Sequence, residues 1–453
     1  MSHDYPMPSG RYRDDVRSIT AGLVCGQEGF LENSAVLIDG DTITGIVPRF
    51  EVPGEATVED WGNVAIVPGT VNAHGHAFQN LLKGFADDMP FDRWRDDVLY
   101  PFSERLDEEA IYAGALFAFA EALLAGATTT VDFFYLHDEG NSNAAAVIRA
   151  AKDIGVRLVL ARAFYDLDAP TKAPARFREP AGDAAARCLD LAREFARDPL
   201  VSVQPAPHSL HAASVGTVRA ALEVAHELEA PCHLHLAEAA YERDLIQERY
   251  GTTPVRLLQR EGLLDPSLVT IHTVWVDDEE LDLIADSGAG VVHCPGANAF
   301  LGDGIARLPE MLSRGIRVAL GPDGGCANNR QSVFDEMRSA SLFAKARLAD
   351  GGALDAPTAF RLGTAGGADL LGLPVGRIEA GCPADLVALD LDDLSLQPPQ
   401  NLERQIVNSM QSTAITKVMV AGEVVVDSGR LVRVESAAIK AAVTGVTKSW
   451  ARP

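Results

Sequence analysis

The sequence predicts an α/β protein: a (β/α)8 TIM barrel with a small β-sandwich domain that the N- and C-terminal segments build together. Two observations lead to this fold class. Eight short apolar runs alternate with stretches whose apolar residues recur at helical spacing. Short β-type runs also precede and follow this alternating region. A doubly wound open sheet is the main alternative, but no glycine-rich phosphate-binding fingerprint follows a strand.

The small domain is predicted from both ends of the chain. In the N-terminal segment, residues 35–38 and 42–47 read as strands, and Asp39-Gly40-Asp41 between them is a hairpin signal. In the C-terminal segment, residues 415–420 and 423–426 flank a turn at Ala421-Gly422. We therefore expect three segments. The small β-domain takes residues 1–65 and 380–453, and the barrel takes residues 66–379.

Each barrel strand is expected where an apolar run is followed by a helical pattern. The intervening segments are rich in Ala, Glu and Arg, which favour helices. The eight predicted strands are residues 64–72, 128–135, 156–164, 201–207, 231–236, 268–273, 290–295 and 317–321.

Composition narrows the function classes. The 453-residue chain has a formal net charge of −25, which disfavours binding to nucleic acid and to anionic membranes. No apolar run approaches the length of a membrane span, and the polar N-terminus lacks a secretory h-region. The six cysteines form no CxxC pair, which is typical of reduced cytoplasmic thiols. We expect a cytoplasmic protein with a small-molecule substrate, and homo-oligomerisation stays open.

Two histidines follow the first barrel run. His74 and His76 are two residues apart, so in an extended segment both imidazoles point to the same side. Imidazole is a common ligand of zinc and other first-row metals. Gly75 between them permits close approach of backbone or ligand. The pair predicts half of a four-ligand metal site.

Further polar residues stand where other barrel strands end. Residues at the carboxyl ends of barrel strands face the active site. These residues are His208, His235, Glu238, His272 and Asp323. Each of them alone also has a structural explanation, such as a turn aspartate or a hydrogen-bonded core histidine. Their gathering on strand ends favours one metal site.

The proposed ligands combine three ring nitrogens with one carboxylate. They are His74, His76, His235 and Asp323. His233 lies on the same strand face as His235, but His235 is nearer the strand end and is preferred. The donor set suits one divalent ion, zinc or ferrous iron, which lowers the pKa of a bound water toward about 7.

Two further residues complete the predicted chemistry. Glu238, three residues after a ligand, is predicted to carry protons to the substrate. His272, together with Asp323, is predicted to orient the water and take its proton.

These motifs resemble the amidohydrolase superfamily in its mononuclear deaminase branch. The resemblance rests on Pro68-Gly69 before His-x-His, on His-x-x-Glu ending at Glu238, and on Gly-Pro-Asp-Gly-Gly around Asp323. It covers residues 20–430. Binuclear members place a bridging lysine or similar ligand at the fourth strand, where this chain has His208, so the resemblance implies one metal.

The substrate residues resemble two subfamilies. In formimino-glutamate deiminases, the matches to Gln79, Arg95, Tyr135 and His208 line the substrate site. The arginine that should bind a substrate carboxylate there is His211 in this chain. We therefore count His211 as a substrate-site position, with a less anionic substrate expected.

Other segments are similar to S-adenosylhomocysteine and methylthioadenosine deaminases. These segments are residues 83–88, 292–295 and 328–338. In those enzymes a glutamate for the ribose hydroxyls is expected where Ser103 stands here. Both substrate signatures are incomplete, while the chemical core is intact.

The sequence thus predicts a hydrolytic deaminase. The expected reaction is amidine C–N hydrolysis with release of ammonia from a small formimino or nitrogen-heterocycle substrate. A triazine-type chlorohydrolase or aminohydrolase is one alternative, although Asp323 favours deamination. A non-catalytic, protein-binding member of the fold is the other, and it would be expected to have lost metal ligands.

Overall fold

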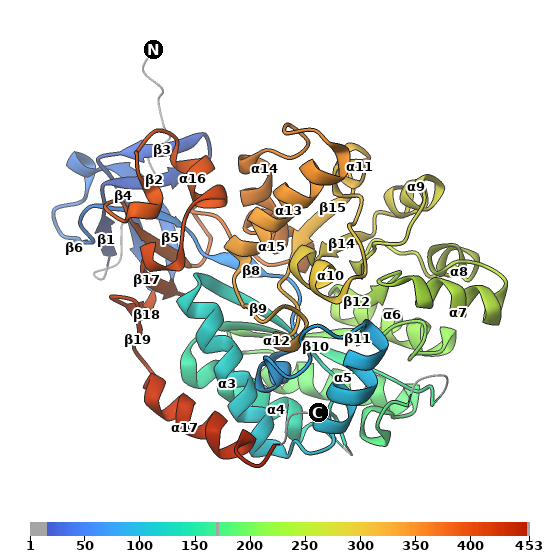
Figure 1. Cartoon of the computed structure of the whole chain (residues 1–453). Helices are drawn as coiled ribbons and strands as arrows, with labels where there is room; N and C mark the ends of the chain where they lie inside the picture. Colours follow the sequence, from blue (N-terminus) through green and yellow to red (C-terminus); the bar gives the residue numbers. More distant parts are fainter. Residues whose placement is uncertain (1–15, 139, 169–171, 451–453) are drawn as a thin grey trace.

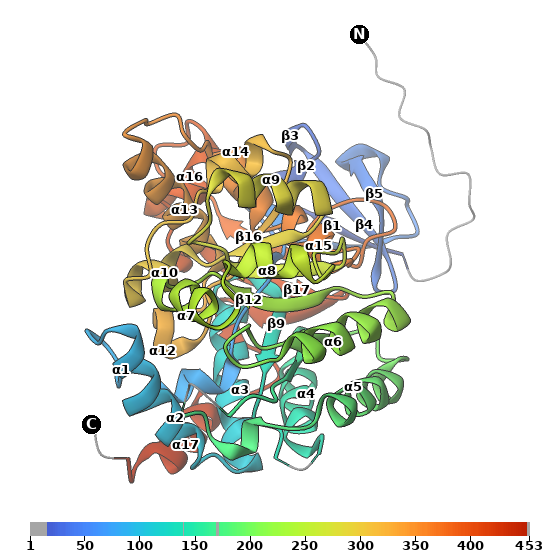
Figure 2. The ribbon, with the colours of Figure 1, turned by 90° about the vertical axis from the view of Figure 1, so that its right-hand side faces the viewer.

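Two four-stranded parallel sheets form the centre of the chain (Figures 1 and 2). The computed structural model describes residues 16–138, 140–168 and 172–450. The sheet orders are β11-β10-β9-β8 and β12-β13-β14-β15. The strands are β8 (Thr70–Asn72), β9 (Ala127–Phe134), β10 (Arg157–Phe164), β11 (Val201–Pro207), β12 (Cys232–Leu236), β13 (Leu268–His272), β14 (Gly290–His293) and β15 (Arg317–Leu320).

Backbone hydrogen bonds connect these two sheets at both of their edges. At one edge, His235 N–H donates to the carbonyl of His208 over 3.1 Å. Ser209 and His235 also form a parallel bridge there. At the other edge, Ala73 N–H donates to the carbonyl of Leu320 over 3.0 Å. The carboxyl ends of β8, β11, β12 and β15 are therefore brought to one end of the sheets.

Helices follow the parallel strands and lie outside them, as Figure 2 shows for α4, α5 and α6. Local sequence sets several ends: Asp277 and Glu280 form a capping box at the start of α9, and Gly155 ends α4 in the left-handed region. The helices are α3 (Glu108–Leu124), α4 (Ser142–Ile154), α5 (Ala181–Phe195), α6 (Val215–Leu228), α7 (Ala240–Tyr250), α8 (Pro254–Arg260), α9 (Asp278–Ser287), α10 (Pro295–Leu301), α11 (Leu308–Ser313), α12 (Gly325–Asn328), α13 (Val333–Leu348), α14 (Ala356–Leu362) and α15 (Ala365–Leu371).

The first predicted barrel strand, residues 64–72, is two strands in the structure. Val64–Pro68 forms β7, which pairs with β16 (Leu386–Asp390) in another sheet, whereas β8 pairs with β9. The division falls at Gly69, where an added Cβ would lie 2.0 Å from the Thr128 hydroxyl. Periodicity alone could not find this break, because both strands are fully buried and neither shows a polar face.

The remaining strands form two sheets from both ends of the chain, at upper left in Figure 1. Their orders are β5-β4-β1-β6 and β19-β18-β17-β16-β7-β2-β3. The hairpins predicted at residues 39–41 and at 421–422 are confirmed by antiparallel pairing across each turn. The strands are β1 (Val16–Thr20), β2 (Leu23–Gly26), β3 (Gly29–Glu32), β4 (Ser34–Asp39), β5 (Thr42–Pro48), β6 (Thr57–Asp60), β17 (Ile415–Val420), β18 (Glu423–Asp427) and β19 (Arg430–Leu431).

A buried ion pair joins these sheets to the parallel ones. Arg157, the first residue of β10, donates through Nε and Nη2 to the two carboxylate oxygens of Asp385, each over 3.1 Å. Asp385 also accepts the backbone N–H of Gly69 on its carbonyl. Because both side chains are almost fully buried, this two-pronged contact satisfies charges that would otherwise be costly to desolvate.

The segment between β8 and α3 folds into short helical turns beside the carboxyl ends of the strands. It comprises a 3-10 helix (Ala77–Leu82), α1 (Phe91–Arg93), a π-helix (Trp94–Leu99) and α2 (Tyr100–Ser103). Two helices complete the C-terminal part, α16 (Leu402–Asn408) and α17 (Ser436–Thr447). After α17, Trp450 packs its ring against Phe85 and Phe102 of the helical segment.

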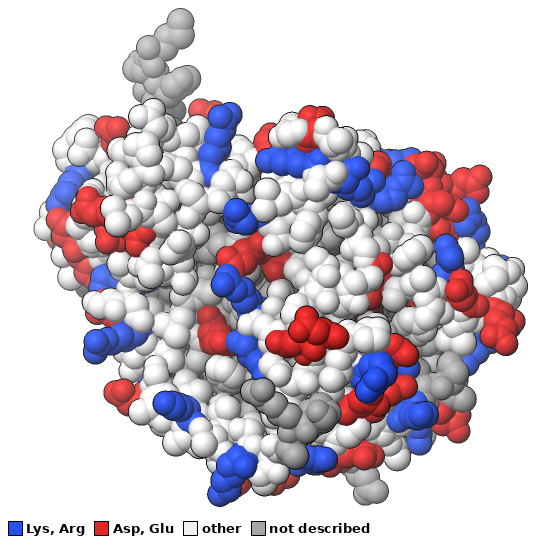
Figure 3. All heavy atoms as spheres, in the orientation of Figure 1, with Lys and Arg blue, Asp and Glu red and all other residues white. Residues whose placement is uncertain are grey.

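Acidic and basic side chains are interspersed over the face shown in Figure 3. All six cysteines are free thiols. None of the helices in the described part of the chain combines the length and the apolar character needed to cross a membrane.

Candidate metal centre

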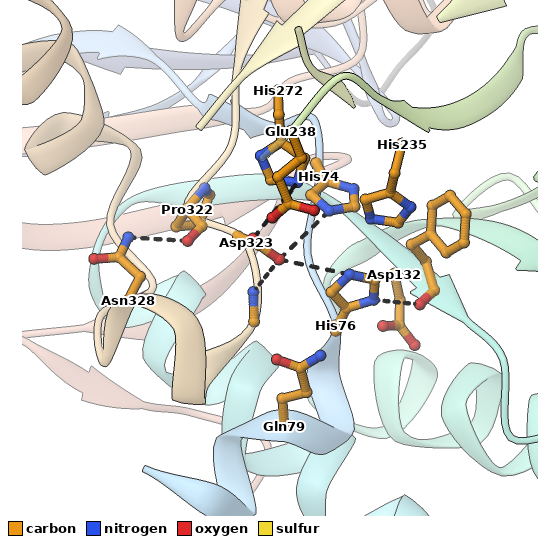
Figure 4. A network of polar contacts seen from close by, with 12 residues as sticks. His74, His76, Gln79, Asp132, His235, Glu238, His272, Pro322, Asp323 and Asn328 are labelled. Atoms are coloured by element: carbon orange, nitrogen blue, oxygen red, sulfur yellow. Dashed lines mark hydrogen bonds and ion pairs between the residues drawn. The ribbon is translucent and has the colours of Figure 1, made fainter. Parts of the chain in front are cut away.

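His74 and His76 stand just after β8, and a backbone contact fixes the ring of His76 (Figure 4). The Nδ1–H of His76 donates to the carbonyl of Phe133 on β9 over 2.6 Å. The backbone N–H of His74 donates to the side chain of Asn72 over 3.0 Å. With Nδ1 of His76 occupied, its Nε2 is left as a lone-pair donor toward the centre.

His235 presents its ring to the same point from β12. Its Nδ1–H donates to the carbonyl of His208 over 2.7 Å, so its Nε2 is also left as a lone-pair donor. The ring of His235 lies 4.9 Å from that of His74 and 5.4 Å from that of His76. His233 instead bonds Gln204 over 2.7 Å in the core, which agrees with its assignment to packing.

Asp323 brings a carboxylate from the loop after β15. Its Oδ1 lies 3.4 Å from Nε2 of His74 and 3.5 Å from Nε2 of His76. The backbone of Asp323 has a φ of +67°, a left-handed conformation that is uncommon outside glycine and is held here by surrounding contacts. Gln331 donates to the Asp323 carbonyl over 3.0 Å, and Asn328 donates to the preceding carbonyl of Pro322 over 2.9 Å.

These groups suit a divalent cation. Candidate ligand atoms of His74, His76 and Asp323 lie within 4.8 Å of one another. Both ring nitrogens of His74 are buried without a hydrogen-bond partner among the described residues, as expected of a side chain that binds a cation. Burial lowers the pKa of His74, His76 and His235 below 6.5, so the imidazoles are neutral, as metal ligation requires.

Glu238 and His272 lie beside this cluster. The Oε1 of Glu238 is 3.4 Å from Nε2 of His272, which is 3.9 Å from Oδ2 of Asp323. Burial, followed by the charges of Asp303 and Asp323, raises the pKa of Glu238 well above its usual value. A carboxyl group with a raised pKa, such as that of Glu238, is suited to proton transfer. The backbone of His272 is in the left-handed region, with a φ of +71°.

The structure also brings the predicted substrate residues Gln79, Tyr135 and His208 next to the cluster. The Gln79 amide donates to the Tyr135 hydroxyl over 3.0 Å. The ring of Tyr135 lies 5.3 Å from the ring of His76 and 5.3 Å from that of His208. Burial lowers the pKa of His208 well below 6.5, so its imidazole is neutral.

Arg95 lies in the π-helix and is already paired. Its Nε donates to Asp96 over 2.7 Å. Its guanidinium also lies over the rings of Phe91, Tyr100 and Tyr241, at 5.6–5.8 Å from their centroids. The positive charge that could bind a substrate carboxylate is therefore partly compensated within the protein.

His211 is buried and contacts the hydroxyl of Tyr241 over 3.2 Å. Burial, reinforced by the positive charge of Arg95, lowers the pKa of His211 to about 3. The imidazole is therefore neutral at pH 7, and weak binding of an anion at this position stays a prediction.

Residues that sequence reasoning missed surround the predicted ones. Tyr241 and Phe91 contribute rings beside Arg95. Asn298 contacts both His272 and Asp303. A weak signal existed for Asn298 and Asp303, because they stand in and just after α10, which follows β14 at the same end of the sheet. No pattern pointed to Tyr241, since it lies near the start of α7, a mostly polar helix.

Comparison with known proteins places this site in a family. The model of the amidohydrolase family matches residues 65–425. The chain is 34% identical over 426 residues to a 5-methylthioadenosine/S-adenosylhomocysteine deaminase of Nitratidesulfovibrio vulgaris, covering 92% of this chain and 93% of that protein. It is 32% identical over 414 residues to a 5'-deoxyadenosine deaminase of Methanothermobacter thermautotrophicus, covering 90% and 94%.

Solved structures agree with this assignment. A zinc-bound adenosine deaminase from Xanthomonas campestris superposes with a TM-score of 0.88 at 30% identity, covering 95% of this chain and 97% of that one. A zinc-bound atrazine chlorohydrolase from Arthrobacter aurescens superposes with a TM-score of 0.88 at 25% identity, covering 95% and 99%. With its histidine and carboxylate cluster at the strand ends, this chain belongs to the amidohydrolase family.

Proposed function

We propose that this protein is a metal-dependent hydrolytic deaminase that acts on an amino-substituted nitrogen heterocycle. The observation that carries the proposal is a buried cluster in which Asp323 lies within 3.5 Å of His74 and His76, the ring of His235 lies 4.9 Å from that of His74, and Glu238 stands beside His272. The named relatives that act on adenine nucleosides support the reaction class.

In this proposal one cation, zinc in first place and ferrous iron in second, is held by His74, His76, His235 and Asp323. The lone-pair nitrogens of three neutral imidazoles and one carboxylate oxygen match the donor set that zinc prefers. A cation bound there lowers the pKa of a coordinated water, which makes hydroxide available near neutral pH. The zinc-bound structures of relatives support zinc.

The protein's own residues then move the protons. Asp323 accepts the proton of the attacking water, and His272 orients that water from the other side. Glu238 delivers a proton to the ring nitrogen next to the reacting carbon and then takes up the hydroxyl proton of the tetrahedral intermediate. Asp323 passes the proton that it took from water to the departing amine. The net reaction replaces an exocyclic C–NH2 by C=O, consumes water and releases ammonia.

The surroundings of the metal favour a flat heterocycle over a dicarboxylic formimino acid. Tyr135, Phe177 and Tyr100 form consecutive ring contacts at 5.0 and 5.8 Å that begin next to His76. Aromatic faces stack well on a planar, uncharged ring. A dicarboxylate would meet Arg95, whose charge Asp96 partly compensates, together with uncharged imidazoles. Gln79, Arg95, Tyr135, His208 and His211 are accordingly proposed as substrate-site residues.

For the fold, we propose that the eight parallel strands close into a (β/α)8 barrel, residues 66–379. The hydrogen bonds at both sheet edges support closure. Residues 1–65 and 380–453 are proposed as one β-sandwich domain, with β7 shared across the first boundary and residues 1–15 outside the described part. A cytoplasmic location, with no nucleic acid or membrane as partner, is part of the same proposal. The oligomeric state is left open.

Ammonia release from the zinc-loaded protein tests the function. The substrates are adenine nucleosides, free aminopurines and pterins, formimino-glutamate, and a chlorotriazine scored for chloride. We expect a heterocyclic amine to exceed formimino-glutamate in kcat/KM by roughly a hundred-fold, the value of one or two charged hydrogen bonds. Glu238→Gln protein prepared in parallel controls for contaminating deaminases. Release of chloride alone, or efficient turnover of formimino-glutamate alone, contradicts the proposal.

A further inference from the structure

The side-chain amide of Asn298 lies between His272 and Asp303, and all three groups are buried. Its Nδ2 is 3.1 Å from Nδ1 of His272 and 3.3 Å from Oδ2 of Asp303. Neither Asn298 nor Asp303 is among the residues to which the proposed mechanism gives a role. His272, by contrast, faces Glu238 and Asp323 with its other ring nitrogen.

The loop after β14 builds this arrangement. Asn298 is carried by α10, and Gly302 ends that helix with a φ of +75°. The turn folds the chain back, so that Asp303 N–H donates to the Asn298 carbonyl over 2.9 Å. Trp275 anchors the returning chain by donating from Nε1 to the Asp303 carbonyl over 2.8 Å. The two side chains are thus held together by backbone contacts as well.

Asp303 decides which end of the Asn298 amide faces His272. Burial raises the pKa of Asp303 to about 7, so above this pH the carboxylate is ionised and can only accept hydrogen bonds. The atom of Asn298 next to it must then be the NH2 group. In this orientation both amide hydrogens have acceptors, one on Asp303 and one on His272. The reversed amide would set its oxygen against the carboxylate and leave both hydrogens without these acceptors, at a cost typical of buried unpaired donors.

The direction of this hydrogen bond fixes the proton on the imidazole. Because Asn298 donates, Nδ1 of His272 must be the unprotonated nitrogen, and the neutral ring carries its proton on Nε2. That Nε2 lies 3.4 Å from Glu238 and 3.9 Å from Asp323. His272 therefore offers a donor to the place where the water and the substrate oxygen meet these carboxylates.

We propose that Asn298, oriented by Asp303, is a positioning residue that holds His272 in the Nε2–H tautomer. His272 then donates a hydrogen bond to the oxygen that adds to the reacting carbon, and it cannot instead present a lone pair. The catalytic consequence rests on the proposed deaminase function. The tautomer itself does not, so the two can fail separately.

A swap of the two side chains separates this role from mere packing. Asn298→Asp alone would place two carboxylates 3.3 Å apart, so charge repulsion would add to any effect on His272. The double variant Asn298→Asp with Asp303→Asn keeps one amide and one carboxylate in contact. It reverses the polarity toward His272, because an aspartate at 298 accepts from Nδ1–H. Asn401→Asp, at the exposed N-cap of α16, is the control for an added charge.

We expect the swapped protein to keep its melting temperature and its metal, while kcat falls by roughly 10²-fold or more, with KM little changed. The control should equal wild type. A swapped protein with wild-type kcat would show that the pair serves only packing, and would overturn the proposal.

Nitrogen NMR of the zinc-loaded, ¹⁵N-histidine-labelled protein reads the tautomer without any substrate. The His272 signals are assigned by their loss in His272→Gln. We expect the protonated nitrogen to be Nε2 in wild type and Nδ1 in the swapped protein. Protonated Nδ1 in wild type overturns the proposal, whatever the stability of the variants. Protonated Nε2 together with no deaminase activity on any amine retains the positioning role and rejects the proposed function.

Discussion

The metal half and the substrate half of this site are built by different means. In the metal half, His76 and His235 each donate Nδ1–H to a backbone carbonyl of a neighbouring strand. In the substrate half, Arg95 and His211 are placed by side chains, namely Asp96 and Tyr241. The strands that place the first group also form the core, whereas short helical turns and loops place the second.

This difference in how the residues are held indicates which part of the site can change while the fold is retained. Metal ligands tied to strand backbone retain their position whatever the neighbouring side chains are. Substrate residues tied to one another depend on several loop side chains at once, so one replacement alters the whole surface. The same chemistry can thus serve different substrates on this scaffold.

Removal of a metal ligand should have the largest effect. His235→Ala deletes one of the three ring nitrogens, and the cation should be lost together with all activity above background. Elemental analysis should give about one metal per chain in wild type, as the four-ligand set requires, and much less in the variant. Two metals per fully active chain would contradict the mononuclear proposal and the comparison built on it.

The substitution Glu238→Gln should have the next largest effect on activity. It keeps the size of the side chain and removes its proton transfer, so the rate should fall by roughly 10²–10⁴-fold, the usual value of general acid–base catalysis. The metal content should stay at the wild-type level, because Glu238 is assigned no ligand role. A variant that loses metal along with activity would make Glu238 a ligand and move it into the metal half.

The metal half was largely predictable from sequence, for the same reason that it is rigid. Alternation within strands and the gathering of strand ends at one edge placed His74, His76 and His235 without knowledge of any contact. The predicted strands agree with the observed ones to within two residues, apart from the run that divides at Gly69. Gly69 packs so closely on Thr128 that a Cβ there would clash, and no local pattern connects two residues so far apart in the sequence.

The substrate half was only partly predictable. Arg95 and His211 were named because they match, or fail to match, positions in relatives, and not because of any spacing. Tyr241 and Asn298 act through contacts between elements far apart in sequence, which single-sequence patterns do not record. The neutral state of His211 depends on burial, and burial is a property of the folded chain.

His211→Arg tests the substrate half directly. The wild-type imidazole is neutral and offers one hydrogen bond, whereas an arginine offers a permanent charge and two donors. The variant should raise kcat/KM for formimino-glutamate by roughly ten- to a hundred-fold, and should lower it for a neutral heterocyclic amine. His211→Lys is the matched control, with the charge but without the paired donors. No gain with either variant would mean that Arg95 and its neighbours do not form a carboxylate site.

The smallest expected effect is on stability against acid. The folded pKa of His211, about 3, lies below the ordinary value of 6.5, so protons bind the unfolded chain more readily. The stability associated with neutral His211 is present above pH 6.5 and is lost as the pH falls toward 3. At pH 5 this loss amounts to roughly 2 kcal/mol relative to pH 8.

His211→Gln removes this titration while retaining an acceptor for the Tyr241 hydroxyl. The difference in unfolding free energy between variant and wild type should therefore shift in favour of the variant by about that amount between pH 8 and pH 5. Denaturant unfolding at both pH values measures it, and release of metal at low pH cancels because both proteins share the metal half. An unchanged difference would mean that water reaches His211 and that the substrate half is more open than its contacts imply.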